Sequence, residues 1–137
     1  MYMEQIKFRA WDKTSKIMLD VVSVVFIGGV TDQKIVMQTP DKPHEQWNSF
    51  RDQVEIMQFT GLLDKNGKEI FEGDIIKTNE GLRFVVEDSG GFGTENKEDY
   101  GKDWLNVSSF EWLIETIENK GGVEVIGNVF ENSDLLK

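Results

Sequence analysis

One stretch of this sequence, residues 110–117, repeats its apolar residues with the period of an α-helix, and it lies late in the chain. The repeating residues, at i, i+3, i+4 and i+7, are Phe110, Leu113, Ile114 and Ile117. At its start, Ser108 and Glu111 have the spacing of a capping box, in which two side chains bond the unpaired amides of a helix terminus. Glycines at 121–122 favour termination. The pattern predicts one helix, over residues 109–119.

The remaining sequence consists of short apolar or β-branched runs separated by turn-forming residues, which is typical of a β protein. Residues 6–11 alternate apolar and basic side chains and predict a half-buried strand with Ile6, Phe8 and Ala10 inward. The valine-rich residues 16–26 follow a polar turn, so the two segments predict a hairpin. Further strands are expected at residues 34–38, 54–59, 75–77, 82–87, 104–107 and 123–130, with a tight turn at 64–67.

Length and composition favour a single domain over residues 1–137, because the chain is of ordinary domain size and contains no cysteine for disulfides. The strand start at residues 73–76, Gly-Asp-Ile-Ile, is similar to the first strand of SH3-like barrels. The expected fold is mainly β, at the margin of the α+β class. It is either a small SH3-like barrel or a strongly bent antiparallel sheet, with an N-terminal hairpin and the one helix near 109–119.

Three segments lack a strand pattern. Residues 39–44 contain both prolines and predict a loop, and residues 47–52 are compatible with a short helical turn. Residues 88–103 contain four glycines and five acidic residues, and we interpret them as a mobile loop or a loosely paired excursion. Their glycines lack the lysine of a phosphate-binding loop.

The net charge of −10 is unevenly distributed along the chain. Residues 1–50 hold six basic and six acidic side chains, residues 51–77 four and six, and residues 78–137 five and thirteen. An acidic field repels nucleic acid and suits a basic protein partner, although solubility alone also explains it. The longest apolar stretch, residues 21–30, is too short to cross a bilayer, which takes about 20 residues. Because the N-terminus also lacks a signal-peptide pattern, we expect a cytoplasmic protein.

Little in the sequence indicates catalysis. His44 is the one histidine, and cysteine is absent, so a thiol nucleophile is excluded and a clustered His or Cys metal site is not indicated. Residues 64–69 only superficially suggest a calcium loop, because its glycine and final glutamate are at the wrong positions. The acids Glu69, Glu72 and Asp74 are the nearest carboxylate cluster, and we interpret them as exposed turn acids. We expect no enzymatic activity, no cofactor and no metal.

Two surfaces are candidates for binding. Acidic and aromatic residues in and beside the 88–103 segment predict a protein-binding site, with a flexible solvated loop as the equally good alternative. These residues are Phe92, Glu95, Glu98, Asp99, Tyr100, Asp103 and Trp104. Basic residues interleaved with an aromatic on the first hairpin predict a weaker nucleic-acid-binding alternative. They are Lys7, Arg9, Trp11 and Lys16. Exposed sheet edges also allow self-association.

Three blocks of the sequence resemble the YopX family of phage and prophage proteins. They are residues 6–12 (IKFRAWD, with Met18 following), residues 58–76 (QFTGLLDKNGKEIFEGDII) and residues 125–132 (VIGNVFEN, with Leu135 and Leu136 following). The middle block is long and specific, whereas residues 31–53 and 88–122 carry little of the resemblance. Ser133 stands where the family pattern has proline. The resemblance implies a small, mostly β, phage-encoded protein with no agreed activity and without assigned catalytic residues. Together with the acidic C-terminal half of the chain, it leads us to expect an accessory protein that binds a host or phage factor.

Overall fold

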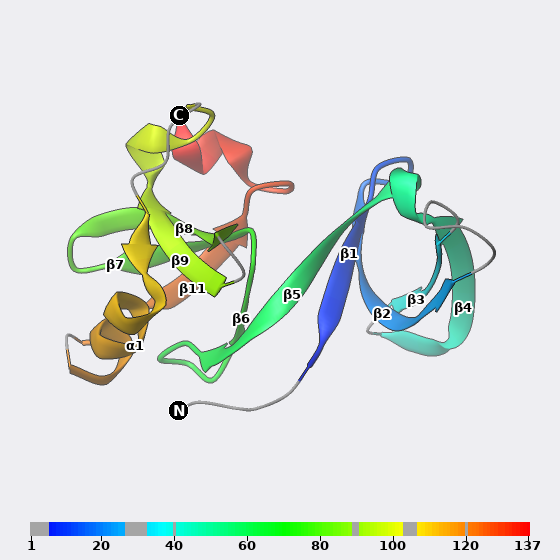
Figure 1. Cartoon of the computed structure of the whole chain (residues 1–137), viewed down its shortest axis with the longest axis horizontal. Coiled ribbons are helices and arrows are strands. Elements are labelled where there is room, and N and C mark those ends of the chain that lie inside the picture. The colour runs from blue at the N-terminus through cyan, green and yellow to red at the C-terminus, as the bar shows by residue number, and fades with distance from the viewer. Residues whose placement is uncertain (1–5, 27–32, 40, 89–90, 103–106, 120) are drawn as a thin grey trace. The chain divides into compact units, whose positions relative to one another are not determined.

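The computed structural model describes residues 6–26, 33–39, 41–88, 91–102, 107–119 and 121–137. The described chain forms two compact units, residues 6–58 and residues 59–137, which are shown in Figure 1. The prediction of a single domain concerns how the two units fold together, and it stays a prediction.

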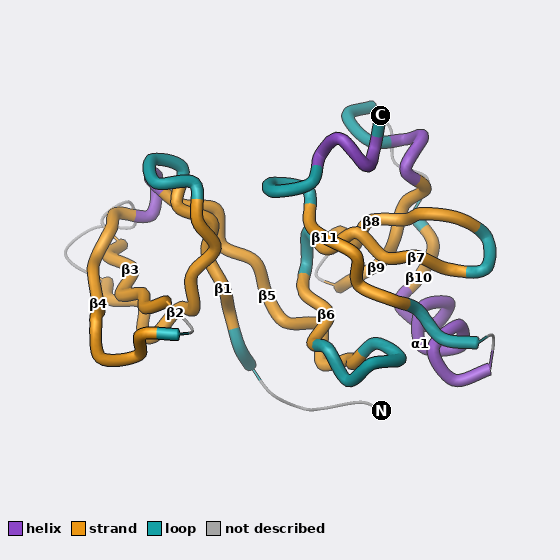
Figure 2. Tube along the Cα trace, turned by 180° about the vertical axis from the view of Figure 1, so that it is seen from behind, coloured by secondary structure: helices purple, strands orange, loops and turns teal. Residues whose placement is uncertain are grey.

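Residues 6–58 form an antiparallel sheet in the order β4-β3-β2-β1-β5. Its elements are β1 (Phe8–Asp12), β2 (Ile17–Phe26), β3 (Gln33–Thr39), β4 (Lys42–Phe50), the 3-10 turn η1 (Arg51–Gln53) and the first half of β5 (Val54–Leu63). The predicted N-terminal hairpin is confirmed, because β1 pairs with β2 from Arg9↔Asp20 to Asp12↔Ile17. Figure 2 shows the strands of this unit curving, and register shifts in the β2–β3 and β3–β4 pairs fit such a bend.

One apolar cluster holds this unit together. Its fully buried members come from four of the strands and are Ala10, Leu19, Ile35, Met37 and Val54. Ala10 is inward, as predicted, but the prediction for Ile6 is wrong, because its side chain is 82% exposed. The predicted loop at residues 39–44 is also wrong in extent, since β4 already begins at Lys42 and contains Pro43. Proline is tolerated there because β4 is an edge strand. The helical turn expected at 47–52 is displaced to η1.

Residues 59–137 form a second antiparallel sheet, in the order β10-β9-β8-β7-β11, while the end of β5 pairs with β6. Its elements are β6 (Glu69–Phe71), β7 (Asp74–Thr78), β8 (Gly81–Asp88), β9 (Gly91–Asn96), η2 (Lys97–Asp99), β10 (Ser108–Ser109), α1 (Phe110–Asn119), β11 (Glu124–Asn128) and η3 (Ser133–Leu136). In the described part of the chain α1 is the one α-helix, and it confirms the predicted helix.

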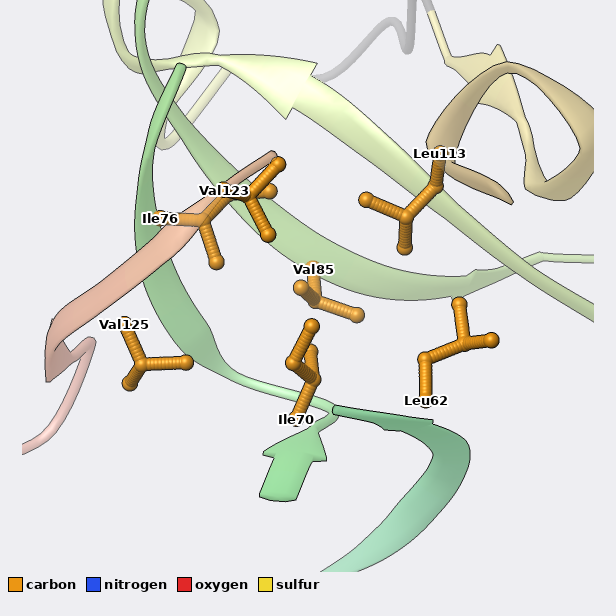
Figure 3. Packing of buried hydrophobic residues seen from close by; sticks show 7 residues of the cluster. All are labelled: Leu62, Ile70, Ile76, Val85, Leu113, Val123 and Val125. Carbon is orange, nitrogen blue, oxygen red and sulfur yellow. The ribbon is translucent and has the colours of Figure 1, made fainter. Parts of the chain in front are cut away.

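This second sheet is covered on both faces. On one face the apolar side of α1 packs on a cluster that Figure 3 shows, and its buried members are Leu62, Ile70, Ile76, Val85, Leu113, Val123 and Val125. On the other face Leu136 of η3 packs on Ile75 and Phe84. Because neighbouring strand residues point to opposite faces, Ile75 and Ile76 are both fully buried, each in its own cluster.

Two further expectations are corrected here. The expectation of a mobile loop or a loosely paired excursion at residues 88–103 is wrong for residues 91–96, because β9 pairs in regular register with β8 from Arg83↔Asn96 to Asp88↔Gly91. The helix is capped by Ser109, whose Oγ accepts a hydrogen bond from the Trp112 N–H at 3.2 Å, and not by the predicted Ser108. The fold is mainly β, with antiparallel sheets that do not close into a barrel, so the SH3-like detail is not confirmed.

Candidate functional site

The turn in the middle block of the family pattern is organised by one buried carboxylate, Asp64. Its Oδ1 accepts hydrogen bonds from the N–H groups of Asn66 and Lys68, both at 2.8 Å. Its Oδ2 accepts one from the N–H of Val125 in β11, at 2.9 Å. Gly67 completes the turn with a φ of 81°, which a residue with a Cβ adopts only at a cost. Asp64 thus joins the turn to a strand 61 residues away and is used structurally.

Two other polar residues of the family blocks also serve the backbone. Asp74 is 1% exposed, so its interpretation as an exposed turn acid is wrong. Its Oδ2 accepts a hydrogen bond from the Phe71 N–H at 2.7 Å. Asn128 ends β11, and its Oδ1 accepts from the N–H groups of Phe130 at 3.0 Å and Glu131 at 2.9 Å. These blocks build turns, which leaves their buried polar groups little freedom to act on a ligand.

A buried guanidinium, which the sequence gave no reason to single out, joins β8, β9, β10 and α1. Arg83 is 5% exposed, and its Nε donates to the Thr94 Oγ1 at 2.8 Å. Its Nη1 donates to the Asn96 Oδ1 at 2.6 Å, and its Nη2 to the Ser108 Oγ at 2.6 Å. The guanidinium carbon lies 4.5 Å from the ring centre of Trp112, in a cation–π arrangement. This geometry fixes the β10–α1 segment against the sheet.

The positive charge of Arg83 is offset by acidic side chains that do not form an ion pair with it. Burial lowers the pKa of the guanidinium, while the charges of Glu80, Asp99, Glu95 and Glu98 act in the opposite direction. None of the ion pairs in the described ranges involves Arg83. An arginine nevertheless keeps its proton at any ordinary pH. The acids around η2 therefore have an internal role, which is to offset a buried cation.

The structure separates the predicted acidic and aromatic residues onto two faces of the sheet. Phe92 packs near Phe110 of α1, with ring centres 6.0 Å apart. Glu95 lies directly opposite Phe84 in the β8–β9 pair, and its side chain is only 2% exposed. Tyr100 contacts Phe84 edge to face at 5.3 Å and remains 43% exposed. The residues therefore do not form one continuous surface.

Among the acids of this set, Glu98 is exposed and Asp99 is buried. The Oδ1 of Asp99 accepts a hydrogen bond from the Lys102 Nζ at 3.2 Å. Asp103 and Trp104 lie outside the described residues. Of the predicted protein-binding residues, Glu98 and Tyr100 are thus the two shown to be exposed.

An exposed acidic stripe runs along α1, and the sequence-based search for sites did not select it. Glu111, Glu115 and Glu118 fall at i, i+4 and i+7, on the side opposite to the buried Leu113. Like charges at this spacing destabilise a helix by about 0.2–0.5 kcal/mol per pair. The helix contains no basic residue that would relieve them. The amphipathic pattern of the sequence could have revealed this stripe, because it determines the polar face of the helix as well as the apolar face.

The predicted nucleic-acid surface lies among acids. Arg9 and Trp11 share the face of β1 opposite to Ala10, Lys7 precedes the strand, and Lys16 is exposed in the hairpin turn. Asp20 lies directly opposite Arg9 in β2, and Glu55 lies opposite Trp11 in β5. Glu55 also pairs with Lys13 at 3.3 Å. Cross-strand neighbours of this kind are about 4.5–5.5 Å apart, so they reduce the positive potential of the hairpin.

A pocket of about 230 Å³ lies beside the Asp64 turn. It is lined by Lys65, Lys77, Thr78, Asn79, Gly121, Gly122 and Glu124. Glu124 lies between both lysines, because its Oε2 is 3.9 Å from the Lys65 Nζ and it is the cross-strand neighbour of Lys77. Within the described ranges no group of three His, Cys, Asp or Glu side chains is placed to hold a metal ion. Likewise, none of the described helices has the length and apolarity that a bilayer span requires.

Comparison with known proteins identifies a family and a similar solved structure. The family model described as "YopX protein" matches residues 7–137. The crystal structure of protein EF1440 from Enterococcus faecalis is similar, with a TM-score of 0.63 and 26% identity, over 97% of this chain and 99% of that one. Among curated proteins none matches the sequence. With nearly all of its length matched by the family model, this chain belongs to the YopX family.

Proposed function

We propose that this protein is a phage or prophage accessory protein that works in the bacterial cytoplasm by binding a basic protein, without catalysis. The binding surface would be the acidic stripe of α1. The observation that carries the proposal is the exposure of three glutamates on one helix face, in a unit that already has eight basic and seventeen acidic residues. Complementary charge speeds encounter with a partner and excludes partners of the same sign.

The stripe fits a binding surface better than it fits a stabilising one. Glu118 lies near the C-terminus of α1, where the helix dipole disfavours a negative charge. The glutamates also repel one another and have no ion-pair partner in the described part of the chain. Repulsion between the three glutamates destabilises the helix. A basic partner would relieve this repulsion on binding, which accounts for an acidic stripe at this position.

A role without catalysis is supported by how two buried carboxylates of the family blocks are used. Asp64 accepts three backbone hydrogen bonds, and Asp74 accepts one from Phe71. A general acid or base needs a free proton position facing a substrate. The pocket beside the Asp64 turn is lined by two lysines and one glutamate, and Glu124, the one carboxylate in that lining, lies beside both lysines.

The test is affinity capture from nuclease-treated host lysate, comparing the wild type with Glu111→Lys/Glu115→Lys/Glu118→Lys. A matched control is Asp41→Lys/Asp52→Lys/Glu80→Lys, which makes the same change in net charge at three exposed positions elsewhere. We expect a stoichiometric basic protein with the wild type and the control, and its loss with the α1 variant. If all three proteins retain the same partner, the α1 surface is not the binding site. Loss from the α1 variant and the control alike would mean that net charge alone accounts for binding.

The alternative function is nucleic-acid binding by the first hairpin. Arg9 and Trp11 share one face of β1, but Asp20 and Glu55 lie across from them. This function requires an affinity that falls steeply with salt, because binding to phosphates releases counterions. Fluorescence anisotropy with labelled single-stranded DNA at low and high salt tests it. A flat response, or no binding at low salt, removes this alternative.

A further inference from the structure

The edge of β4 is the longest free strand edge in the described part of the molecule. β4 spans nine residues and pairs with β3 on one side, regularly from residue 46 to residue 50 and again at Lys42 beyond a register shift, and the described ranges place no second strand on its other side. The outer groups of an edge strand are unpaired donors and acceptors that readily add another strand. The side chains described along β4 are polar, and its outer backbone groups are available to a further strand.

The other sheet is protected at both of its edges. β10 is only two residues long. At β11, the Lys65 N–H donates to the Val123 carbonyl at 2.9 Å, and the Val125 N–H donates to Asp64 at 2.9 Å. The turn therefore occupies the outer edge next to β11. The contrast makes β4 the longest strand at a sheet edge in the described part of the chain.

From this edge we infer a homodimer in which β4 pairs antiparallel with β4 of a second copy. Residues 6–58 contain seven basic and seven acidic side chains, so this unit lets two copies approach without local repulsion. The strongly acidic residues 59–137 would instead repel the same residues of a second copy. In a dimer with a two-fold axis, β4 of each copy pairs with β4 of the other, so the interface is self-complementary and both β4 edges become paired. The inference concerns self-association and is independent of the function proposed for α1.

The sequence of β4 suits such a pairing. In a register centred on residue 47, Gln46 lies opposite Asn48 of the second copy, and Asn48 lies opposite its Gln46. Amide side chains can donate and accept, so both pairs are self-compatible. Glu45 falls opposite Ser49 and not opposite another charge. Because one strand pair buries little surface, the dissociation constant should be roughly micromolar or weaker.

Charge substitutions at the two exposed amides test the pairing. Sedimentation velocity of the full chain over about a hundredfold range of concentration should show a monomer–dimer equilibrium. Gln46→Lys/Asn48→Lys and Gln46→Glu/Asn48→Glu should each stay monomeric where the wild type dimerises, because like charges meet across the strands. An equimolar mixture of the two variants should recover the dimer. Asn66→Lys/Asn79→Lys, with the same change in net charge at exposed positions of the other unit, should dimerise like the wild type.

Proline substitutions separate the interface from the fold. Successive residues of an edge strand direct their N–H groups alternately to the neighbouring strand and to the outside. Of Asn48→Pro and Ser49→Pro, one should therefore lower the melting temperature and the other should abolish the dimer with little loss of stability. A wild type that stays monomeric throughout the range would overturn the inference. So would a dimer that persists in both charge variants, since it would lie on another surface.

Discussion

In residues 59–137 a turn covers the last strand of the sheet and both sheet faces are packed. The described part of residues 6–58 has one buried cluster, and its edge strand β4 is not covered by any other described segment. The difference follows the family resemblance. The long middle block and the last block lie in residues 59–137, apart from Gln58. Their polar residues Asp64, Asp74 and Asn128 accept hydrogen bonds from backbone N–H groups. The uncovered β4 lies in residues 31–53, which carry little of the resemblance. The blocks that characterise the family thus specify a scaffold, and the exposed features of α1 and β4 are free to specify partners.

The two units also differ in charge, and the difference separates structural from surface electrostatics. In residues 59–137 a buried Arg83 is surrounded by neutral hydrogen-bond acceptors, with acids further away. In residues 6–58 charges are paired at the surface, as in Lys13 with Glu55. Buried polar groups are costly to leave unpaired, and exposed ion pairs contribute little. Substitutions of buried polar groups in residues 59–137 should therefore have much larger effects on stability than substitutions of surface charges in residues 6–58.

The largest effect is expected for Asp64→Ala, which leaves three backbone N–H groups without their acceptor. Hydrogen bonds to a charged group contribute about 1.5–3 kcal/mol each and are not additive, so we expect a loss of about 3–5 kcal/mol. Urea unfolding measures it, with the exposed Asp134→Ala as the control, for which a change within about 0.5 kcal/mol is expected. A loss of stability below about 1 kcal/mol for Asp64→Ala would contradict the larger stability effects expected in residues 59–137.

Arg83→Met should cost about 2–4 kcal/mol, because Thr94, Asn96 and Ser108 lose a shared donor and Trp112 loses its cation. Arg83→Lys should cost nearly as much, since an ammonium cannot reproduce the planar fork. The comparison in the other unit is Lys13→Met, which breaks an exposed ion pair and should cost about 0.5 kcal/mol. Equal losses for Arg83→Met and Lys13→Met would show that Arg83 does not organise its surroundings.

Gly93→Ala should cost about 2–3 kcal/mol, because a Cβ at this position meets Val107 and lies 2.7 Å from the Ser108 carbonyl oxygen. At Gly101 nothing lies within 4 Å of an added Cβ, and only its φ of 84° opposes alanine. Gly101→Ala should therefore cost about 1 kcal/mol. Thermal unfolding compares the two. If Gly93→Ala is the milder change, β10 is not packed tightly against β9.

The smallest predicted effect is an increase in stability from a substitution in residues 6–58. Lys16 has a φ of 58°, a conformation that costs a non-glycine residue about 1–2 kcal/mol. Lys16→Gly removes this strain but adds flexibility to the unfolded chain, so a net gain of about 0.5 kcal/mol is expected. Lys16→Ala, with the same φ requirement, should bring no gain in a chemical denaturation series. A gain accompanied by lost DNA binding would favour the nucleic-acid alternative.

Several elements were predictable because their signals are local. The stripe at residues 110–117 sets the helix, and the Asp64–Gly67 turn is specified by residues that tolerate its backbone angles. β9 was missed because its inward residues include Thr94 and Glu95, which gives the strand no hydrophobic alternation. Its glycine at 93 was interpreted as mobility, but the structure uses it for close approach of β10.

The candidate sites were less predictable, because they depend on which face each strand presents. Phe92 and Glu95 are close in sequence, but the alternation of a strand places them on opposite faces. Arg83 stands among apolar residues of β8, and only its partners in β9 and β10 show why a basic residue belongs there. The bond from Asp64 to Val125 spans 61 residues and has no local signature.

The central claim is that the family blocks close residues 59–137 while β4 stays open, and native-state hydrogen exchange tests it most directly. The measurement is made residue by residue at a concentration where the chain is monomeric. The account predicts that the amides of Lys68, Phe71 and Val125, which donate to buried carboxylates, belong to the slowest class. Alternate amides of β4 should exchange within about tenfold of the unfolded rate, because their N–H groups face solvent. Fast exchange at Val125, or uniform protection along β4, would contradict the account.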